Sequence, residues 1–224
     1  MTQNDQSCLL FDIDGTLVDS DRLHIVAMNE ICGAYGVSFD EETFRTRISG
    51  RMNNVIFAEF LPHVPVEEHA DISNRKEALF RTMASNMKPL EGLMELLDWA
   101  DSVELPYAAV TNAPRENAHF VLRALNAMER FKAVILSDEL DHAKPHPLPY
   151  LTGLQKLAGS AHRSVAFEDS KSGVTSAHGA GLSVVGLTTS MDSETLRAHG
   201  AVMTAPDYRD AELLRFVKEQ TGRR

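Results

Sequence analysis

Short apolar segments alternate with helical patterns along most of the chain, and this alternation constrains the fold more than any other feature. The apolar segments at 8–11, 107–110, 133–136, 164–167 and 182–187 are long enough for buried strands and too short for ordinary helices. Strands that alternate with helices form a parallel sheet that helices cover on both faces. We therefore predict an α/β fold. The expected flanking elements are helices at about 90–100, 114–126, 147–158, 172–180 and from 210 onward, and a short strand at 201–203.

A helical block separates the first apolar segment from the others. Residues 40–87 contain no convincing strand pattern, and Ser49-Gly50 and residues 62–65 interrupt the apolar spacing there. We therefore expect an all-α insertion directly after the first strand. Its expected helices run from Ser20 or Asp21, as the capping residue, to about Ile31, and over about 40–48, 52–61 and 66–87.

Two carboxylates follow the first strand in the segment Asp12-Ile13-Asp14-Gly15-Thr16. In an extended backbone the side chains of Asp12 and Asp14 fall on the same side. Two acids at the end of a buried strand repel each other, and a cation between them removes that cost. Gly15 allows backbone to approach a ligand closely. The segment therefore predicts a cation site, although an acidic strand-to-loop turn has the same composition.

Polar side chains also follow the later strands. Thr111 and Asn112 end the second apolar segment, Lys144 follows the third, and Glu168 and Asp169 follow the fourth. In parallel sheets, ligands bind beyond the carboxyl ends of the strands. Acids from two strands suit one Mg²⁺ ion, which prefers oxygen ligands. A hydroxyl, an amide and an ammonium group suit the three oxygens of a phosphoryl group.

Each of these residues also has an ordinary explanation when it is considered alone. Lys144 is typical of a surface lysine, because lysine is normally exposed. Glu168 and Asp169 are typical of acids that stabilise a helix start, here the helix near Ser172. Thr111 is typical of a strand-end hydroxyl. The order of the four segments at successive strand ends favours a shared site.

At these four segments the chain resembles the haloacid dehalogenase superfamily, in its branch of phosphatases and β-phosphoglucomutase-like enzymes with a helical cap. The resemblance covers essentially the whole chain. It implies a Rossmann-like parallel sheet flanked by helices, with an inserted all-α cap. The implied core domain comprises 1–17 and 89–224, and the implied cap domain comprises 18–88.

The resemblance also implies a role for each motif residue. Asp12 would be the nucleophile that takes the phosphoryl group, and Asp14 would be the general acid and base. An acid must begin protonated, so we expect the neighbouring carboxylate to raise the pKa of Asp14. The implied ligands of Mg²⁺ are Asp12, the backbone carbonyl of Asp14, and Asp169, with Glu168 at or beside the ion. The implied phosphate-binding residues are Thr111, Asn112 and Lys144.

Three cap residues are candidates for substrate contact or for support of the site. Similar enzymes place a histidine where His24 lies, and it helps to orient the acid/base residue. Gly50 and Arg51 lie where related enzymes have a loop that contacts the substrate. A solvated arginine is an equally good interpretation of Arg51.

Composition limits the partners. The formal net charge of the 224 residues is −10, which disfavours nucleic acid and anionic membranes and leaves a small phosphorylated metabolite as the expected partner. The two cysteines form no disulfide framework. The polar start has no apolar segment typical of a secretory signal, and no segment reaches membrane-spanning length. We expect a cytoplasmic protein and, by default, a monomer.

The leading hypothesis is a Mg²⁺-dependent phosphatase for a small phosphomonoester. The alternative is a β-phosphoglucomutase-like enzyme, although Ser49 and Asn53 stand where such mutases usually place basic residues for a second phosphate. A dehalogenase is disfavoured, because those enzymes lack an acid at the position of Asp14. A phospho-aspartate receiver domain is the alternative from another class, but receivers are smaller and lack a helical lid. Sugar phosphates, phosphoglycolate and nucleoside monophosphates all remain open as substrates.

Overall fold

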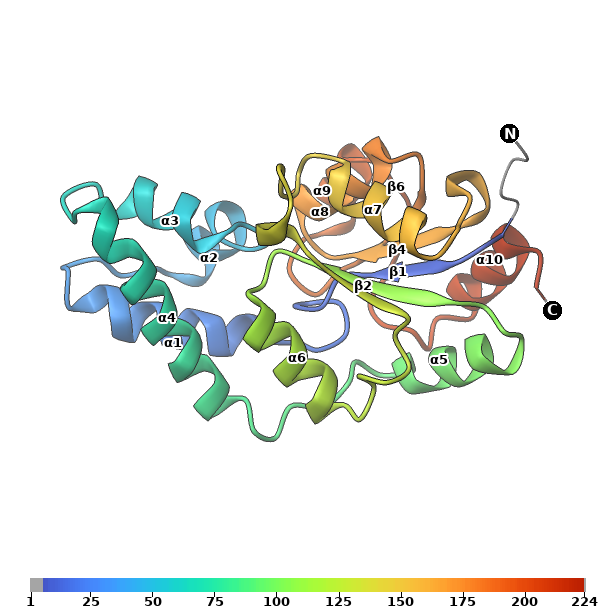
Figure 1. Ribbon diagram of the computed structural model, residues 1–224, viewed down its shortest axis with the longest axis horizontal. Coiled ribbons are helices and arrows are strands. Elements are labelled where there is room, and N and C mark those ends of the chain that lie inside the picture. Colours follow the sequence, from blue (N-terminus) through green and yellow to red (C-terminus); the bar gives the residue numbers. More distant parts are fainter. Residues whose placement is uncertain (1–5, 224) are drawn as a thin grey trace.

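A parallel six-stranded sheet forms the centre of the protein (Figure 1). The structure is a computed structural model, and it describes residues 6–223. All neighbouring strands run parallel in the order β3-β2-β1-β4-β5-β6, which confirms the predicted α/β fold. The strands are β1 (Leu9–Phe11), β2 (Tyr107–Thr111), β3 (Ala133–Leu136), β4 (Val165–Glu168), β5 (Ser183–Leu187) and β6 (Ala201–Ala205).

Strand β1 lies between β2 and β4 and is fully buried on both faces. Burial on both faces explains why its sequence is apolar without alternation. On one face Phe11 stacks on Phe167 of β4, with ring centroids 4.6 Å apart. On the other face Leu10 packs beside Ala108 of β2 and Ala166 of β4. These contacts hold the end of β1 between the ends of its two neighbours.

Helices cover both faces of the sheet (Figure 1). The core with Phe11 includes residues of α5 (Leu93–Ser102), α6 (Arg115–Ala124) and α10 (Ala211–Thr221). The core with Leu10 includes residues of α7 (Leu148–Lys156), α8 (Lys171–Gly179) and α9 (Ser193–Ala198). Two short 3-10 helices, η1 (Ser137–Glu139) and η2 (Ala161–Arg163), lie in the connections.

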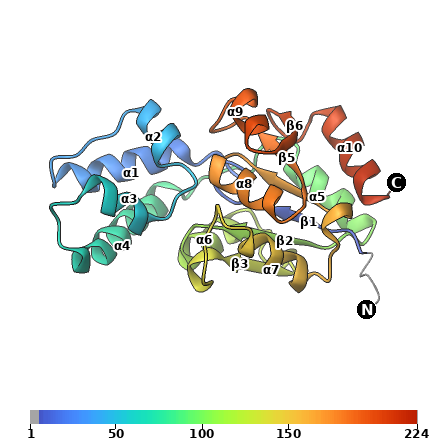
Figure 2. The same cartoon turned by 90° about the horizontal axis from the view of Figure 1, so that it is seen from above.

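The remaining helices form a block beside the sheet, at the carboxyl ends of the central strands (Figure 2). They are α1 (Asp21–Gly33), α2 (Glu41–Arg47), α3 (Asn53–Phe60) and α4 (Val66–Met83). The block has a hydrophobic core of its own, to which Met28, Phe44, Phe57 and Ile72 belong. Within residues 6–223, no helix combines the length and the apolarity that a bilayer crossing requires.

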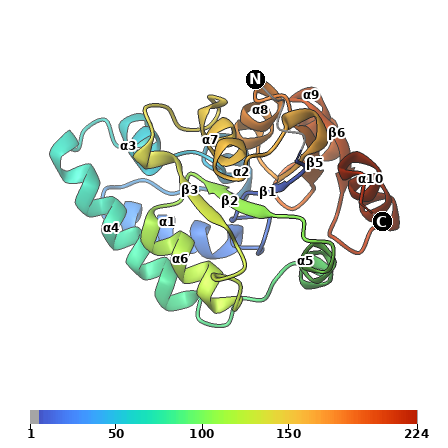
Figure 3. The same ribbon diagram turned by 45° about the vertical axis from the view of Figure 1, so that its right-hand side comes forward.

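The two segments that join the block to the sheet lie side by side. Val18 and Pro89 form an antiparallel bridge, and the amide of Leu90 donates to the carbonyl of Leu17 at 2.9 Å. Helix α4 also contacts α6 of the sheet region (Figure 3), where Arg81 donates to Asn117 Oδ1 at 2.6 Å. The block is therefore anchored at its base as well as along α4.

Four expectations about local structure are wrong. Helix α9 is missing from the prediction, because it has six residues and depends on the side chain of Asp192 for its N-cap. Helix α4 ends at Met83 rather than 87. Helix α5 begins at Leu93 rather than 90, because Leu90 is held by Leu17. Ser20 precedes α1 but makes no side-chain cap, since its hydroxyl binds Asp14 instead.

Candidate active site

Three acids from two strand ends form a buried cluster. Asp12 follows β1, and Glu168 and Asp169 stand at the end of β4, the neighbouring strand. One carboxylate oxygen from each of the three lies within 4.8 Å of the others, and all three residues are buried. The sequence therefore predicts correctly that these acids lie close together. We call Asp12, Glu168 and Asp169 the acid cluster.

One buried cation faces the acid cluster. The Lys144 ammonium donates to Asp12 Oδ1 at 2.7 Å, to Glu168 Oε1 at 2.6 Å and to the carbonyl of Val110 at 2.7 Å. Its side chain is 2% exposed, so Lys144 is no surface lysine. A single ammonium leaves three neighbouring carboxylates with an excess of negative charge.

The pKa values of two of these acids are raised. Burial raises the pKa of Asp12 to about 7, although the Lys144 charge opposes the shift. Burial, followed by the charges of Asp12 and Asp21, raises the pKa of Asp169 well above its usual value. Carboxyl groups whose pKa is raised in this way are stabilised in their ionised form by a second positive charge beside them. The all-oxygen donor set fits a hard divalent cation such as Mg²⁺.

The acids of the cluster differ in the hydrogen bonds that they accept from the protein. Glu168 Oε1 accepts from Lys144 and from the Tyr150 hydroxyl at 2.6 Å, and it is completely buried. Asp169 Oδ2 accepts from the Ser190 hydroxyl. Within residues 6–223, no hydrogen bond reaches Oδ2 of Asp12 or Oδ1 of Asp169. These two oxygens are the ones best placed to bind an ion or a substrate.

Gly15 permits the close approach of the first loop to the acid cluster. A Cβ atom at this position would lie 1.9 Å from Asp169 Oδ2. Thr189 donates to the Gly15 carbonyl, and the Tyr208 hydroxyl donates to the Thr16 carbonyl at 3.1 Å. Only glycine therefore fits between the end of β1 and the carboxylate of Asp169.

The side chain of Asp14 lies outside the acid cluster and points to α1. Its Oδ1 accepts from the Ser20 hydroxyl at 2.7 Å and lies 3.1 Å from His24 Nε2. Burial by itself would raise the pKa of Asp14, but the charge and hydrogen bond of His24 and the bond from Ser20 lower it. The expected raised pKa is therefore wrong. The prediction of the pKa considered only the neighbouring carboxylate, although His24 was expected to orient Asp14, and the bond from Ser20 was not foreseen.

Thr111 and Asn112 end β2 beside the acid cluster. Thr111 is buried, and its hydroxyl accepts from the amide of Ala113 at 3.0 Å. The Asn112 amide donates to the carbonyl of Gly50 at 2.9 Å and, more weakly, to the carbonyl of Lys144 at 3.4 Å. Asn112 Oδ1 is buried and has no partner among the described residues.

The loop with Gly50 brings the helical block onto the strand ends. The Gly50 carbonyl accepts from Asn112 and from the Ser172 hydroxyl, the latter at 2.6 Å. Gly50 has a φ of +72°, and a Cβ there would lie 2.5 Å from Ser170 Oγ. Neighbouring Arg51 is 29% exposed and pairs at 2.7 Å with Glu59, a carboxylate that also pairs with Arg47.

Replacing Ser172 with alanine is expected to loosen this contact. The loss of one hydrogen bond costs about 1 kcal/mol, which corresponds to roughly fivefold faster opening of the loop. Amide hydrogen exchange of residues 49–51 measures this effect. Ser193→Ala, at the exposed start of α9, is the matched control. Equal exchange in both variants would show that the bond to Gly50 does not hold the loop.

A cavity of about 580 Å³ lies between the strand ends and the helical block. Its walls include eight of the predicted site residues, whereas Glu168 and Asp169 are buried and do not line it. The eight residues are Asp12, Asp14, His24, Gly50, Arg51, Thr111, Asn112 and Lys144. Apolar side chains of the block, such as Met28, Phe44 and Ile48, share the lining with polar groups, which is typical of a small-molecule site.

The sequence interpretation missed a buried ion pair in the wall of this cavity. The Lys76 ammonium lies 2.9 Å from Glu77 Oε1 and 2.9 Å from His24 Nδ1, and both residues of the pair are buried. Burial raises the pKa of Glu77, but Lys76 and then His24 outweigh it and lower that pKa. The helical spacing of His69, Lys76 and Phe80 was the available signal, since all three lie on the inner face of α4.

The arrangement of strand ends, buried acids and helical block forms an enclosed site that fits a hard cation and a small polar ligand. The chain matches the haloacid dehalogenase-like hydrolase family over residues 9–187 and therefore belongs to that family. It is 30% identical to a phosphorylated carbohydrates phosphatase of Thermotoga maritima, over 94% of this chain and 98% of that one.

Two further matches agree with this assignment. It is 31% identical to a validoxylamine A 7'-phosphate phosphatase of Streptomyces hygroscopicus subsp. limoneus, over 84% of this chain and 88% of that one. The crystal structure of CbbY from Rhodobacter sphaeroides in complex with phosphate is similar, with a TM-score of 0.80 and 27% identity. That match covers 92% of this chain and 96% of CbbY. The predicted family and the predicted enzyme class, a phosphoric monoester hydrolase, are confirmed.

Proposed function

We propose that the protein is a Mg²⁺-dependent phosphatase that cleaves a small phosphomonoester by way of an aspartyl-phosphate on Asp12. One observation carries the proposal. Three buried acids with a single lysine stand at strand ends beneath a cavity that a helical block covers. Carboxylates buried this close together repel one another, and a bound cation removes that repulsion. The cavity has room for a phosphate ester beside them.

The residues that would hold Mg²⁺ are Asp12, Asp169 and the backbone carbonyl of Asp14, with Glu168 behind them. When bound, the ion would neutralise the acids and stabilise the charge that develops on the transferring phosphoryl oxygens. The Asp169 oxygen that accepts no hydrogen bond supports this assignment, as does the closeness of the three acids.

Asp12 is the nucleophile in this proposal. Lys144 holds Oδ1 of Asp12 and leaves Oδ2 without a partner among residues 6–223, so Oδ2 is the oxygen that attacks phosphorus. Attack forms an oxygen–phosphorus bond to Asp12 and breaks the ester bond. Water then attacks phosphorus, releases inorganic phosphate and restores the carboxylate.

Asp14 moves the protons in this proposal. It donates a proton to the departing ester oxygen and later takes one from the attacking water. Its lowered pKa suits the second step. For the first step, a phosphate dianion beside Asp14 raises the pKa, because a like charge disfavours the ionised form. Ser20 and His24 hold the carboxylate in place for both steps.

Thr111, Asn112 and Lys144 bind the phosphoryl oxygens in this proposal. All three lie on the wall of the cavity beside Asp12. The Lys144 ammonium donates to three protein oxygens, so its contribution is chiefly its positive charge. Most of the catalysis in phosphoryl transfer comes from such positioning and charge stabilisation.

Residues 18–88 serve as the cap domain, and 1–17 with 89–224 serve as the core domain. The separate hydrophobic core of the helical block supports this division, as does the bridge between Val18 and Pro89. The bonds from Asn112 and Ser172 to the Gly50 carbonyl are contacts of a closed cap. Closure excludes water from the site and restricts it to small substrates.

A sugar phosphate is the proposed substrate class, and a mutase is disfavoured. A phosphomutase requires a cation for a second phosphate, and Arg51 in the cap wall is already held by Glu59, which also pairs with Arg47. Ser49 and Asn53 supply no positive charge there. The match to the haloacid dehalogenase-like hydrolase family over residues 9–187 excludes the receiver-domain alternative.

A metabolite panel tests the proposed function. Purified protein with Mg²⁺ is assayed for phosphate release from sugar monophosphates, phosphoglycolate and nucleoside monophosphates. Each assay is repeated with a sugar bisphosphate primer. We expect phosphate release from at least one sugar phosphate without the primer. Isomer formation that depends on the primer, with no net phosphate release, would identify a mutase instead.

A further inference from the structure

We infer that the far end of the cavity, formed by His69, Ser73 and Asn53, binds a hydroxyl group on the uncharged body of the substrate and thereby selects extended monophosphates. This inference rests on the proposed phosphatase function and adds the part of the substrate that lies away from the phosphate. We call these three residues the distal recess.

His69 supplies the first observation. The residue is 6% exposed and lines the cavity, and its Nε2 atom has no hydrogen-bond partner within residues 6–223. The ring packs edge-on against Phe57, with centroids 6.1 Å apart, which fixes its orientation. Leaving a buried polar atom without a partner costs about 1–3 kcal/mol. A ligand hydroxyl that hydrogen-bonds Nε2 would remove that cost.

Ser73 and Asn53 supply the second observation. The amide nitrogen of Asn53 donates to Ser73 Oγ at 2.8 Å and to Glu77 Oε1 at 2.6 Å. Because Ser73 accepts that bond, its own hydroxyl proton is left for another acceptor. The recess thus combines a hydroxyl donor with the neutral amide of Asn53, which suits an alcohol rather than an anion.

The charges around the cavity supply the third observation. Arg51 and Lys76 are the lysine and arginine side chains that the described part of the block contributes to its wall. Arg51 shares the Glu59 carboxylate with Arg47, and Lys76 pairs with Glu77. A second phosphate at Asn53 would lie next to the Glu77 carboxylate, to which the Asn53 amide donates. An uncharged, hydroxylated group meets no such repulsion.

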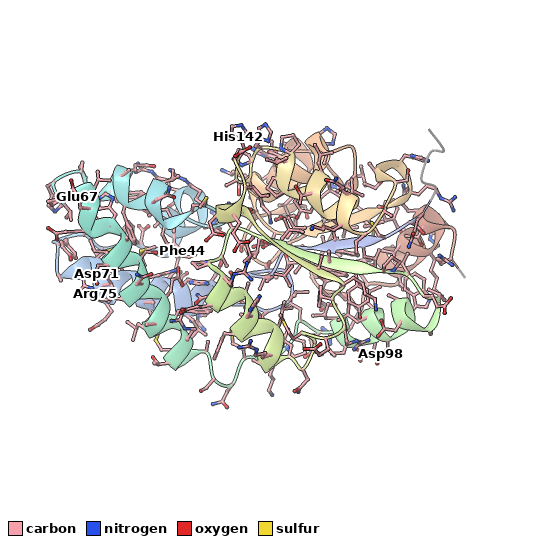
Figure 4. All side chains as sticks on the ribbon, viewed as in Figure 1. Phe44, Glu67, Asp71, Arg75, Asp98 and His142 are labelled. Atoms are coloured by element: carbon pink, nitrogen blue, oxygen red, sulfur yellow. The ribbon has the colours of Figure 1, made fainter. Side chains whose placement is uncertain are left out.

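The geometry of α4 sets the length of the substrate. His69, Ser73 and Lys76 all line the cavity, whereas Asp71 and Arg75 form an exposed ion pair of the same helix (Figure 4). His69 and Lys76 are separated by about 10 Å along the helix axis. Lys76 reaches the acid/base residue only through His24. Two-carbon phosphoesters are therefore too short to reach the distal recess.

Substitutions of His69 test the inference with two kinds of substrate. Glucose 6-phosphate and trehalose 6-phosphate carry hydroxyls away from the phosphate, and acetyl phosphate carries none. His69→Phe keeps a ring of similar shape but removes Nε2, and His69→Gln restores a polar end. His63→Phe, at an exposed histidine of the same block, is the matched control, and circular dichroism checks that each variant folds.

We expect His69→Phe to raise KM for the better sugar phosphate about tenfold, as the loss of one hydrogen bond predicts, with little change in kcat. Activity on acetyl phosphate should be unchanged, and His69→Gln should recover most of the loss. Fructose 1,6-bisphosphate should be a poorer substrate than fructose 6-phosphate.

Three results would overturn the inference while the phosphatase assignment stands. They are an unchanged KM for the sugar in His69→Phe, an equal change for acetyl phosphate, and hydrolysis of acetyl phosphate without hydrolysis of any sugar phosphate. Absence of all phosphate release by the wild type, with Mg²⁺ present, would overturn the proposed function itself.

Discussion

Replacing Asp12 with asparagine is expected to abolish turnover and leave the fold intact. The amide is neutral and cannot attack phosphorus, so kcat should fall by about 10⁴-fold or more. The substitution preserves the shape of the side chain and removes one of three buried negative charges that face a single ammonium. The melting temperature in metal-free buffer should therefore not fall. Steady-state phosphate release and thermal unfolding measure the two effects.

Asp138 provides the matched control for this prediction. It lines the same cavity but lies outside the acid cluster. Asp138→Asn should keep kcat within a few-fold of the wild-type value. Turnover by Asp12→Asn at a rate similar to this control would remove Asp12 from the role of nucleophile.

Replacing Lys144 with methionine is expected to cause the largest loss of stability of any single substitution in the site. Methionine has a similar length but leaves Asp12 and Glu168 buried without their cation. Breaking a buried ion pair from one side costs about 3–5 kcal/mol. Urea unfolding in metal-free buffer measures the loss. Lys156→Met, at an exposed lysine of α7, should cost well under 1 kcal/mol.

The loss should depend on pH in a defined direction. Burial raises the pKa of Asp12 to about 7 even with Lys144 present, so the folded protein binds more protons near neutral pH than the unfolded chain does. Stability linked to such an acid increases as the pH falls through the folded pKa. The difference between wild type and Lys144→Met should therefore shrink from pH 8 to pH 5. A difference that stays constant would show that unpaired carboxylates are not its cause.

The sequence predicted the sheet and the acid cluster because both follow from local patterns. Strand β1 is apolar throughout and is followed directly by Asp12, and the apolar strand β4 ends at Glu168. Parallel strands bring such ends together without any knowledge of the contacts between helices. The distances among Asp12, Glu168 and Asp169 are therefore a consequence of topology.

The sequence pattern did not predict the contacts between side chains that lie far apart in the chain. The lowered pKa of Asp14 depends on Ser20 and His24, whose orientation is known only when α1 is placed. The buried state of Lys76 depends on the packing of α4 against α1. A charged pair such as Lys76 and Glu77 predicts a solvent-exposed helix face, because lysine and glutamate are seldom buried.

Phosphate release from an aryl phosphate, measured first with Mg²⁺, then with excess chelator, and then after Mg²⁺ is restored, tests the central claim most directly. We predict that release occurs in the first assay, stops in the second and resumes in the third. The Mg²⁺ titration should shift to higher concentration in Asp169→Asn. Release that continues at the full rate in chelator would contradict the account, because the acid cluster would then have no cation to bind.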